Sequence, residues 1–470
     1  MTTSEHPYDL IVVGCGAAGL SAALGYIEKA RQLGNQARVA VLESAPLEER
    51  GGATRWTTAR FRAKQNYSLD PLFVGKMQEV SQGLADLDYC RALEAEAPNS
   101  LRFLEQHGIG LIHQDAQIAK GMDHAVMPNG GGRAIVDALA SALGEVKGAE
   151  ILYRMEAIRL TLSETGRLDG VVARGPNGLL RALRGRSLML ACGGFEGNTE
   201  MLTRYVGGNA CDLKLLAPGL AYNQGAGIRM AMDVGAAMSG QFDMMHAELV
   251  DRRTDRADAV ILGHPFGIVV NGDGKRFFDE GQAPYDDNFE QIAYEVWRNQ
   301  RQVAFFIADQ TITKYPGVMV LFDTDKQPIE APGIPELARL LGLEPEQLLQ
   351  TVNAYNAAVG PGDFDPSRID GKSTSGLVPE KSNWAYRLER PPFFAYPVTT
   401  AICFTYGGIR TDAAARVLSG NGTPIPGLYA AGEITGFFYH EYPVGTSVLR
   451  SLTFGRIAGA HAAEAAHASL

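Results

Sequence analysis

Three glycines near the start of the chain have the spacing of a loop that binds a dinucleotide. Gly14, Gly16 and Gly19 form the pattern G-x-G-x-x-G directly after the apolar run 8–13. In such a loop the first glycine makes a tight turn, the second lets the backbone approach a pyrophosphate, and the third lets a helix pack closely on a strand. The helix predicted over 17–33 would offer free N–H groups and the positive end of its dipole to the phosphates. The pattern therefore predicts a pyrophosphate site at this loop.

An acidic residue completes the dinucleotide-binding unit. Glu43 ends the second apolar run, 38–42, and lies 24 residues after Gly19. A carboxylate at this place accepts hydrogen bonds from a ribose diol. The two apolar runs and the helix between them form one β-α-β unit, which predicts a Rossmann-type fold.

Three later segments favour FAD over NAD, because an NAD dehydrogenase needs only the first unit. Residues 51–54, Gly-Gly-Ala-Thr, follow Glu43 as they do in many flavoproteins. Residues 191–195 resemble the ATGGF segment that packs near the flavin dinucleotide, and residues 425–433 resemble a last FAD motif whose acidic residue, here Glu433, meets the ribityl chain. The predicted FAD contacts are Gly14, Gly16, Ala18, Gly19, Glu43, Gly51, Gly52, Ala53, Thr54, Ala157, Gly193, Gly194, Gly407, Gly432, Glu433, Ser447, Val448 and Leu449.

The order of these segments resembles the fumarate reductase and succinate dehydrogenase flavoprotein superfamily. The motifs are most similar to those of tricarballylate dehydrogenase-like and 3-ketosteroid Δ1-dehydrogenase-like proteins, and the resemblance covers nearly the whole chain. Residues 270–280, Val-Asn-Gly-Asp-Gly-Lys-Arg-Phe-Phe-Asp-Glu, resemble the family's VNxxGxRFxxE segment. The resemblance implies an active site between the flavin and an inserted cap. It also implies hydride transfer between flavin N5 and a carbon next to a carbonyl or carboxylate.

The resemblance also bears on how the flavin is attached. In this superfamily a histidine in the segment after the second strand forms the covalent bond to the flavin. Residues 54–59 here are Thr-Arg-Trp-Thr-Thr-Ala and contain no histidine. We therefore expect the FAD to be bound non-covalently.

The composition changes along the chain suggest where the cap lies. From about residue 235 the chain becomes richer in charge, proline and aromatic residues, and the glycine-rich style returns after Pro391 and Pro392. We predict an α/β protein with a discontinuous Rossmann-type FAD-binding domain and an inserted α+β cap domain. The FAD-binding domain would take residues 1–234 and 361–470, and the substrate-binding cap would take residues 235–360.

Two departures from the family pattern argue against a plain fumarate reductase. Fumarate reductases follow the cap segment with an arginine that protonates the substrate carbon, but residues 281–287 contain none, and Tyr285 or Asp286 lies near that place. Fumarate reductases also carry a substrate-binding HTMGG, which here is Phe-Thr-Tyr-Gly-Gly over 404–408. The substrate chemistry must therefore rest on other residues.

Tyrosines are the main catalytic candidates. Residues 438–447 resemble the YHNYPGG of tricarballylate dehydrogenase-like proteins and share Tyr-Pro with ketosteroid dehydrogenases, in which that tyrosine binds the ketone oxygen. Desaturation needs one group that polarises the carbonyl and another that removes the neighbouring proton, and a tyrosine can serve either role. We name Tyr442, Tyr406 and Tyr285 as candidates, with His440 as an alternative proton acceptor.

Two further residues are predicted to contact substrate. Arg450 lies four residues after Thr446 at the start of the last predicted helix, where a guanidinium could clamp a carboxylate; a structural ion pair is the alternative. Thr405 lies in the segment that replaces HTMGG. The N-terminus of the same helix, near 447–449, should point at the flavin and stabilise its anionic reduced form.

Composition limits the partners. The 470 residues carry 43 basic and 53 acidic side chains, so the net charge of −10 argues against nucleic acid as a partner. No apolar run reaches the length of about 18 residues that spans a membrane.

The five cysteines lack metal-type or disulfide-type spacing, so we expect no metal. The first strand begins by about residue 8, leaving no room for a signal peptide, and we expect a cytoplasmic location.

The sequence leaves three functions open. The first is an FAD-dependent dehydrogenase that introduces a C=C bond α,β to a carbonyl or carboxylate of a small keto acid or carboxylic acid, cyclic ones included. The second is an ene-reductase fed by an external electron donor, and the third is a non-redox FAD-containing isomerase. The chain has no haem-binding CxxCH and no second G-x-G-x-x-G, so oxygen, a quinone or an electron-transfer protein would accept the electrons.

Overall fold

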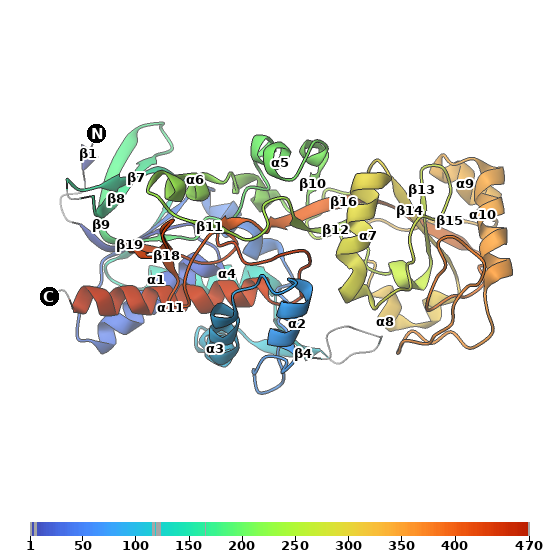
Figure 1. The fold of residues 1–470 in the computed structure, drawn as a ribbon, viewed down its shortest axis with the longest axis horizontal. Helices are drawn as coiled ribbons and strands as arrows, with labels where there is room; N and C mark the ends of the chain where they lie inside the picture. Colours follow the sequence, from blue (N-terminus) through green and yellow to red (C-terminus); the bar gives the residue numbers. More distant parts are fainter. Residues whose placement is uncertain (1, 4–6, 115–117, 119–123, 165, 469–470) are drawn as a thin grey trace.

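The computed structural model describes residues 2–3, 7–114, 118, 124–164 and 166–468. Two large sheets lie toward opposite ends of an elongated molecule, and the chain crosses between them more than once (Figure 1). The first sheet has nine strands and the second has six. This mixed architecture with a parallel sheet is the α/β class that the sequence predicts.

The nine-stranded sheet carries the predicted dinucleotide-binding unit. Its strands are β1 Thr2–Thr3, β2 Tyr8–Val13, β3 Val39–Glu43, β6 Ala149–Tyr153, β7 Glu156–Leu162, β8 Leu168–Arg174, β9 Leu180–Leu190, β18 Arg416–Leu418 and β19 Pro424–Ala430. The main path runs β18-β19-β9-β2-β3-β6, and from β19 to β6 every pairing on it is parallel. The loops that leave the carboxyl ends of β2, β3 and β9 therefore meet at one edge, where ligands bind in such sheets.

Helices α1 Ala17–Gln32, α4 Gly131–Gly144, α6 Ala226–Asp233 and α11 Ser447–His467 pack against strands of this sheet. Helix α3 Leu87–Gln106 packs on α11, α2 Phe73–Val80 packs on α3, and α5 Thr199–Tyr205 packs on the 3-10 turn Ala210–Asp212. Helices α1 and α11 pack closely along their length (Figure 1). A Cβ at Gly455 would collide with the carbonyl of Ala18, and one at Gly459 with the carbonyl of Ala22. The two glycines thus allow the close approach of the helices.

The six-stranded sheet forms the other part of the molecule. Its strands are β10 Lys214–Leu215, β12 Met245–Asp251, β13 Ile268–Asn271, β14 Ala304–Asp309, β15 Ile329–Ala331 and β16 Phe393–Thr405, and its helices are α7 Tyr285–Asn299, α8 Pro316–Met319, α9 Ile334–Leu341 and α10 Pro345–Ala358. Strand β16 is the long central strand and is buried throughout. Because β10 and β16 lie outside 235–360, this sheet uses more of the chain than the predicted cap segment. The division into domains stays a prediction.

Two small two-stranded sheets complete the fold. They pair β4 Leu111–Gln114 with β5 Ala125–Pro128, and β11 Met238–Ser239 with β17 Gly408–Ile409. The side chain of Asp86 caps α3 by accepting from the N–H groups of Asp88 and Tyr89. Strands β6 and β7 are divided at Arg154, which has a φ of 53°.

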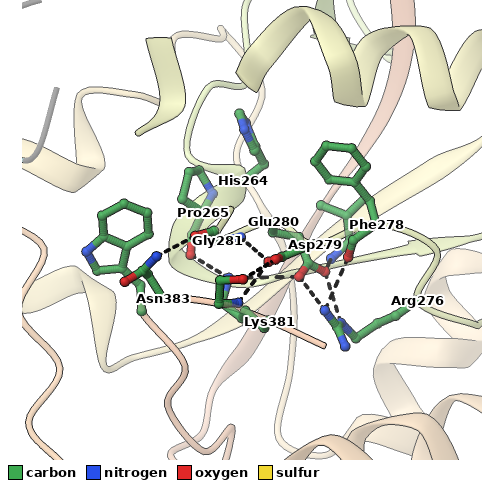
Figure 2. Close-up of polar contacts among 12 residues, drawn as sticks. His264, Pro265, Arg276, Phe278, Asp279, Glu280, Gly281, Lys381 and Asn383 are labelled. Atoms are coloured by element: carbon green, nitrogen blue, oxygen red, sulfur yellow. Dashed lines mark hydrogen bonds and ion pairs between the residues drawn. The ribbon is translucent and has the colours of Figure 1, made fainter. Parts of the chain in front are cut away.

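Charged side chains at the end of the 270–280 segment form buried ion pairs and hydrogen bonds with residues of neighbouring loops (Figure 2). Arg276 donates to Glu280 at 2.7 Å, and Nζ of Lys381 donates to the carbonyl of Pro265 at 2.7 Å and lies 3.9 Å from Glu280. Glu280 and Lys381 are fully buried, and burial lowers the pKa of Lys381 to about 8. A buried charge is tolerated when it is paired and hydrogen-bonded. Arg276 and Glu280 therefore hold neighbouring loops of the second part together.

Candidate active site

One cavity of about 820 Å³ is lined by residues of both sheets, from Val13 and Glu43 in the first to His246 and Cys403 in the second. Most of the predicted FAD contacts lie in its wall. They are Gly14, Gly16, Ala18, Glu43, Gly51, Gly52, Ala53, Thr54, Ala157, Gly193, Gly432, Glu433, Ser447 and Val448.

Four predicted FAD contacts lie behind this wall. A Cβ at Gly19 would collide with the carbonyl of Gly14, and one at Gly194 would collide with the hydroxyl of Thr405. Gly407 packs in the same way against the ring of Phe242, and Leu449 is fully buried in the core. These residues shape the cavity by packing, because nothing larger than a hydrogen fits at the three glycines.

The N-termini of α1 and α11 meet at the cavity, where Ala17 and Ser447 are part of its lining. The N–H of Ala17 donates to the hydroxyl of Thr54 at 3.2 Å. Two helix N-termini place positive dipole ends at one site, which suits the pyrophosphate and the electron-rich edge of a flavin. The loops at Gly14 and Gly51, both with positive φ, bring backbone against the same space.

Glu43 is held by backbone donors at the carboxyl end of β3. Its carboxylate accepts the N–H of Cys15 at 3.1 Å and the N–H of Ala45 at 2.8 Å. Burial raises the pKa of Glu43, and these hydrogen bonds oppose that rise. The carboxylate keeps lone pairs for a ribose diol. Glycine loops, helix N-termini and this acid together fit FAD.

Glu433 forms a pair with a residue that the sequence analysis missed. The amide of Asn223 donates to Glu196 at 2.5 Å and to Glu433 at 3.3 Å, and the N–H of Thr405 donates to Glu433 at 3.0 Å. Burial and the charge of Glu433 raise the pKa of Glu196 well above its ordinary value. The raised pKa of Glu196 favours its neutral form, which lowers the repulsion between two buried carboxyl groups.

Tyr442 lies in the cavity wall and is hydrogen-bonded at both its hydroxyl and its backbone N–H. Its hydroxyl oxygen accepts the N–H of Thr446 and the N–H of Ser447, each at 3.1 Å, and its own N–H donates to Glu290 at 3.0 Å. Two accepted bonds use both lone pairs of the phenol oxygen. The hydroxyl proton of Tyr442 is then left as a donor.

Tyr285, the first residue of α7, lies in the same wall and contacts an arginine from the other part of the chain. Nη1 of Arg60 donates to the hydroxyl of Tyr285 at 3.0 Å, and both residues line the cavity. Burial raises the pKa of Tyr285, while Arg60 lowers it. The cavity therefore holds two tyrosines in different surroundings, one beside helix N–H groups and one beside a cation.

The geometry of the cofactor end agrees with a comparison against protein families. The model of the FAD binding domain family matches residues 9–448. The chain belongs to this family. It is an FAD-dependent oxidoreductase that acts on CH–CH groups, as the motifs predict.

Named proteins and solved structures resemble the chain over different lengths. A probable fumarate reductase of Shewanella frigidimarina is 25% identical over 97% of this chain and 74% of its own length. The 4-oxocyclohexanecarboxylate 2-dehydrogenase of Sinomonas cyclohexanicum is 30% identical over 70% of this chain and 60% of its own length. The solved 3-ketosteroid Δ1-dehydrogenase of Sterolibacterium denitrificans has a TM-score of 0.76 and 21% identity, covering 99% of this chain and all of that one, and so shows the same fold.

A buried histidine network was missed by the sequence analysis. His246 lines the cavity, and its ring nitrogens lie 2.5 Å from Glu290 and 3.2 Å from Glu248. Burial by itself lowers the pKa of His246, but Cys403, Glu248 and Glu290 raise it well above its ordinary value. Both carboxylate contacts favour the protonated form of His246, whose ring lies 4.7 Å from the ring of Tyr442. The sequence carries only a weak signal for this network, because Glu290 lies 44 positions from His246.

His246, Glu248 and Cys403 also place potential metal ligands within 4.8 Å of one another. Sequence spacing did not predict this set. Both ring nitrogens of His246 already have carboxylate partners, and burial raises the pKa of the Cys403 thiol. An imidazole with two carboxylate partners beside a buried thiol describes a polar network.

Two catalytic candidates lie outside the lining of this cavity. The hydroxyl of Tyr406 donates to Glu290 at 2.8 Å, and burial and Glu290 raise the pKa of Tyr406 well above its ordinary value. Tyr406 is linked to the wall of the larger cavity through Glu290, which also contacts His246 and Tyr442, and its catalytic role stays a prediction. His440 lies in the wall of a second cavity of about 420 Å³, which Glu290 also lines.

The predicted substrate contacts are engaged by the protein itself. Nη1 of Arg450 donates to the backbone and the hydroxyl of Thr435, and the guanidinium lies over the rings of Phe437 and Phe438. Thr405 is bonded to Glu433 and lies outside the cavity lining. Arg450 nevertheless lines the cavity, and its Nε has no hydrogen-bond partner among the described residues, so its role as a substrate contact stays a prediction.

Among the described residues, no helix is both long and apolar enough to cross a membrane.

Proposed function

We propose that the protein is a dehydrogenase that introduces a C=C bond α,β to the carbonyl of a small keto acid or carboxylic acid, cyclic ones included. The observation that carries the proposal is the hydroxyl of Tyr442, which accepts two N–H bonds at the start of α11 and so keeps its proton to donate. A donor of this kind polarises a ketone and stabilises the enolate oxygen that forms. The neighbouring C–H then becomes acidic.

Tyr285 is the proposed base. Its hydroxyl lies in the same cavity and beside Arg60, so its phenolate form has a counter-charge. Tyr285 takes the α-proton while the β-hydrogen leaves as hydride, and bound FAD supplies the hydride acceptor. The substrate loses one proton and one hydride in all, and the C=C bond forms. Of the tyrosines predicted to be catalytic, Tyr442 is thus the acid and Tyr285 the base.

The walls at this end suit an apolar ring. Leu262, Phe289 and Phe404 line the cavity with the two tyrosines. The relative from Sinomonas cyclohexanicum is named as a dehydrogenase of 4-oxocyclohexanecarboxylate, a cyclic keto acid. This compound and its ring analogues are therefore the first substrates to test. Oxygen, a quinone or an electron-transfer protein is the proposed acceptor.

The test is anaerobic mixing of the FAD-loaded enzyme with small ketones, keto acids and carboxylates. Bleaching of the visible flavin band by a saturated ketone supports the proposal. A screen in which no saturated compound bleaches the flavin, while an enone or an α,β-unsaturated acid re-oxidises the reduced enzyme, contradicts it. That outcome supports an ene-reductase, which the match to a probable fumarate reductase over 97% of the chain favours as the second candidate. Conversion of a substrate with no redox change of the flavin supports an isomerase.

A further inference from the structure

The cap segment after Glu280 has no arginine, yet a guanidinium reaches the cavity next to that segment from elsewhere in the chain. Arg60 follows the short 3-10 helix over Gly52–Trp56, and its Nη1 donates to the hydroxyl of Tyr285 at 3.0 Å. Tyr285 is 2% exposed, so the contact is shielded from bulk water. Arg60 and Tyr285 lie 225 positions apart in the sequence.

The backbone around Arg60 is fixed on both sides. The N–H of Phe61 donates to the carbonyl of Val126 at 2.7 Å, and the N–H of Arg62 donates to the carbonyl of Gly445 at 2.9 Å. The guanidinium of Arg62 adds a bond to the carbonyl of Val444. Arg60 is therefore held between two well-anchored neighbours, and the second anchor is the loop that follows Tyr442.

The guanidinium of Arg60 is suited to stabilise a negative charge on the hydroxyl of Tyr285. In the part of the chain that the structure describes, Nε of Arg60 is buried and has no hydrogen-bond partner, and no carboxylate forms an ion pair with this arginine. An arginine stays protonated at any working pH. A fixed cation with Tyr285 as its hydrogen-bonded neighbour favours the charged form of that phenol.

We propose that Arg60 is a positioning residue that stabilises the phenolate of Tyr285 and so makes this tyrosine a base. The inference rests on the dehydrogenase function proposed above. In each turnover the phenolate takes the α-proton of the substrate, and the resulting phenol releases a proton to water before the next turnover. Arg60 takes no proton and gains no bond to the substrate.

The charges that act on Tyr285 oppose one another. Burial, with the neighbouring Asp286, raises the pKa of Tyr285 above its ordinary value, and Arg60 opposes that rise in part. Because the base form is the deprotonated one, kcat/KM should rise with pH. Removing Arg60 should move that rise to higher pH.

The experiment compares FAD-loaded wild type with Arg60→Met, Arg60→Lys, Tyr285→Phe and the control Arg55→Met. Arg55 lies nearby in sequence, but its guanidinium is bonded to Asp137 at 3.0 Å. The ultraviolet absorbance of tyrosinate is titrated without substrate, and the curve of wild type minus Tyr285→Phe isolates Tyr285. The same variants are assayed over a range of pH with 4-oxocyclohexanecarboxylate as probe.

The expected result is that Arg60→Met moves the Tyr285 titration to higher pH and lowers kcat/KM at neutral pH at least about tenfold. Arg60→Lys should recover part of both, and Arg55→Met should match wild type. A Tyr285 titration that is the same in Arg60→Met and wild type overturns the inference. So does a rise in KM alone, because that result would make Arg60 a substrate clamp. Full activity of Tyr285→Phe would instead remove the proposed base, which is a failure of the proposed function.

Discussion

Nδ1 of His246 lies 2.5 Å from Oε1 of Glu290, and this contact joins the cavity wall to helix α7. The same carboxylate accepts the hydroxyl of Tyr406 and the backbone N–H of Tyr442. One buried carboxylate thus holds His246 in the cavity wall and the start of the loop that carries the proposed carbonyl donor. The position of Tyr442 depends on a residue that does not touch the larger cavity.

Replacing Glu290 with glutamine tests this dependence. The amide keeps the shape but removes the negative charge, so His246 loses one of the groups that raise its pKa. Breaking a buried charge pair costs about 3–5 kcal/mol, so the free energy of unfolding should fall by that order. Activity should fall about tenfold or more, with FAD content unchanged. Denaturant unfolding and steady-state assays measure both; Glu295→Gln, on the same helix and bonded to Asn299, is the control. Equal stability of the two variants would refute the role of Glu290.

Tyr442→Phe removes the proposed carbonyl donor and leaves the ring in place. Loss of a positioned proton donor should lower kcat by about 100-fold or more. The matched control is Tyr439→Phe, because Tyr439 lies outside the cavity lining and its hydroxyl accepts the N–H of Gly240 at 2.9 Å. Rates of flavin bleaching by a ketone measure the effect in FAD-loaded protein. Near-normal bleaching by Tyr442→Phe would exclude this tyrosine from the reaction.

The pH dependence of the free energy of unfolding should report the protonation of His264. This side chain is fully buried and its Nε2 lies 2.7 Å from Oδ1 of Asn288; burial lowers its pKa to about 4. In the unfolded chain His264 binds a proton at about pH 6.5, whereas in the folded chain it stays neutral down to about pH 4. The contribution of His264 to the free energy of unfolding is therefore complete above about pH 6.5 and is lost as the pH falls to about 4. The shift corresponds to roughly 3 kcal/mol in total.

Denaturant titrations of wild type and His264→Gln at several pH values isolate this contribution. Glutamine does not titrate, so the difference in unfolding free energy between the two proteins should change as the pH falls from 6.5 to 4. The wild type should lose more stability than the variant over that interval. Parallel curves for the two proteins would show that His264 is not the group responsible.

The flavin should leave the polypeptide on denaturation. Residues 54–59 contain no histidine for a covalent bond, and this segment lies along the cavity wall. After acid precipitation the yellow colour should be found in the supernatant, with the absorbance spectrum of free FAD. A coloured pellet would contradict the prediction.

Local patterns in the sequence were enough to predict the cofactor end. Gly14, Gly16 and Glu43 lie within one β-α-β unit, so their positions relative to each other follow from short-range geometry. Helix α1 ends one residue before the helix predicted over 17–33. The family then follows from the order of such units.

Tertiary structure alone decided the substrate end. Arg60 meets Tyr285, and His246 meets Glu290, only because loops and strands from distant parts of the chain pack into one cavity. Packing likewise brings Nη1 of Arg450 to the carbonyl of Thr435 while the residue stays in the cavity lining. No spacing rule encodes such contacts, since they depend on how whole elements lie against one another. The sequence by itself determined the cofactor, and the packing of the two sheets decided which side chains face the substrate.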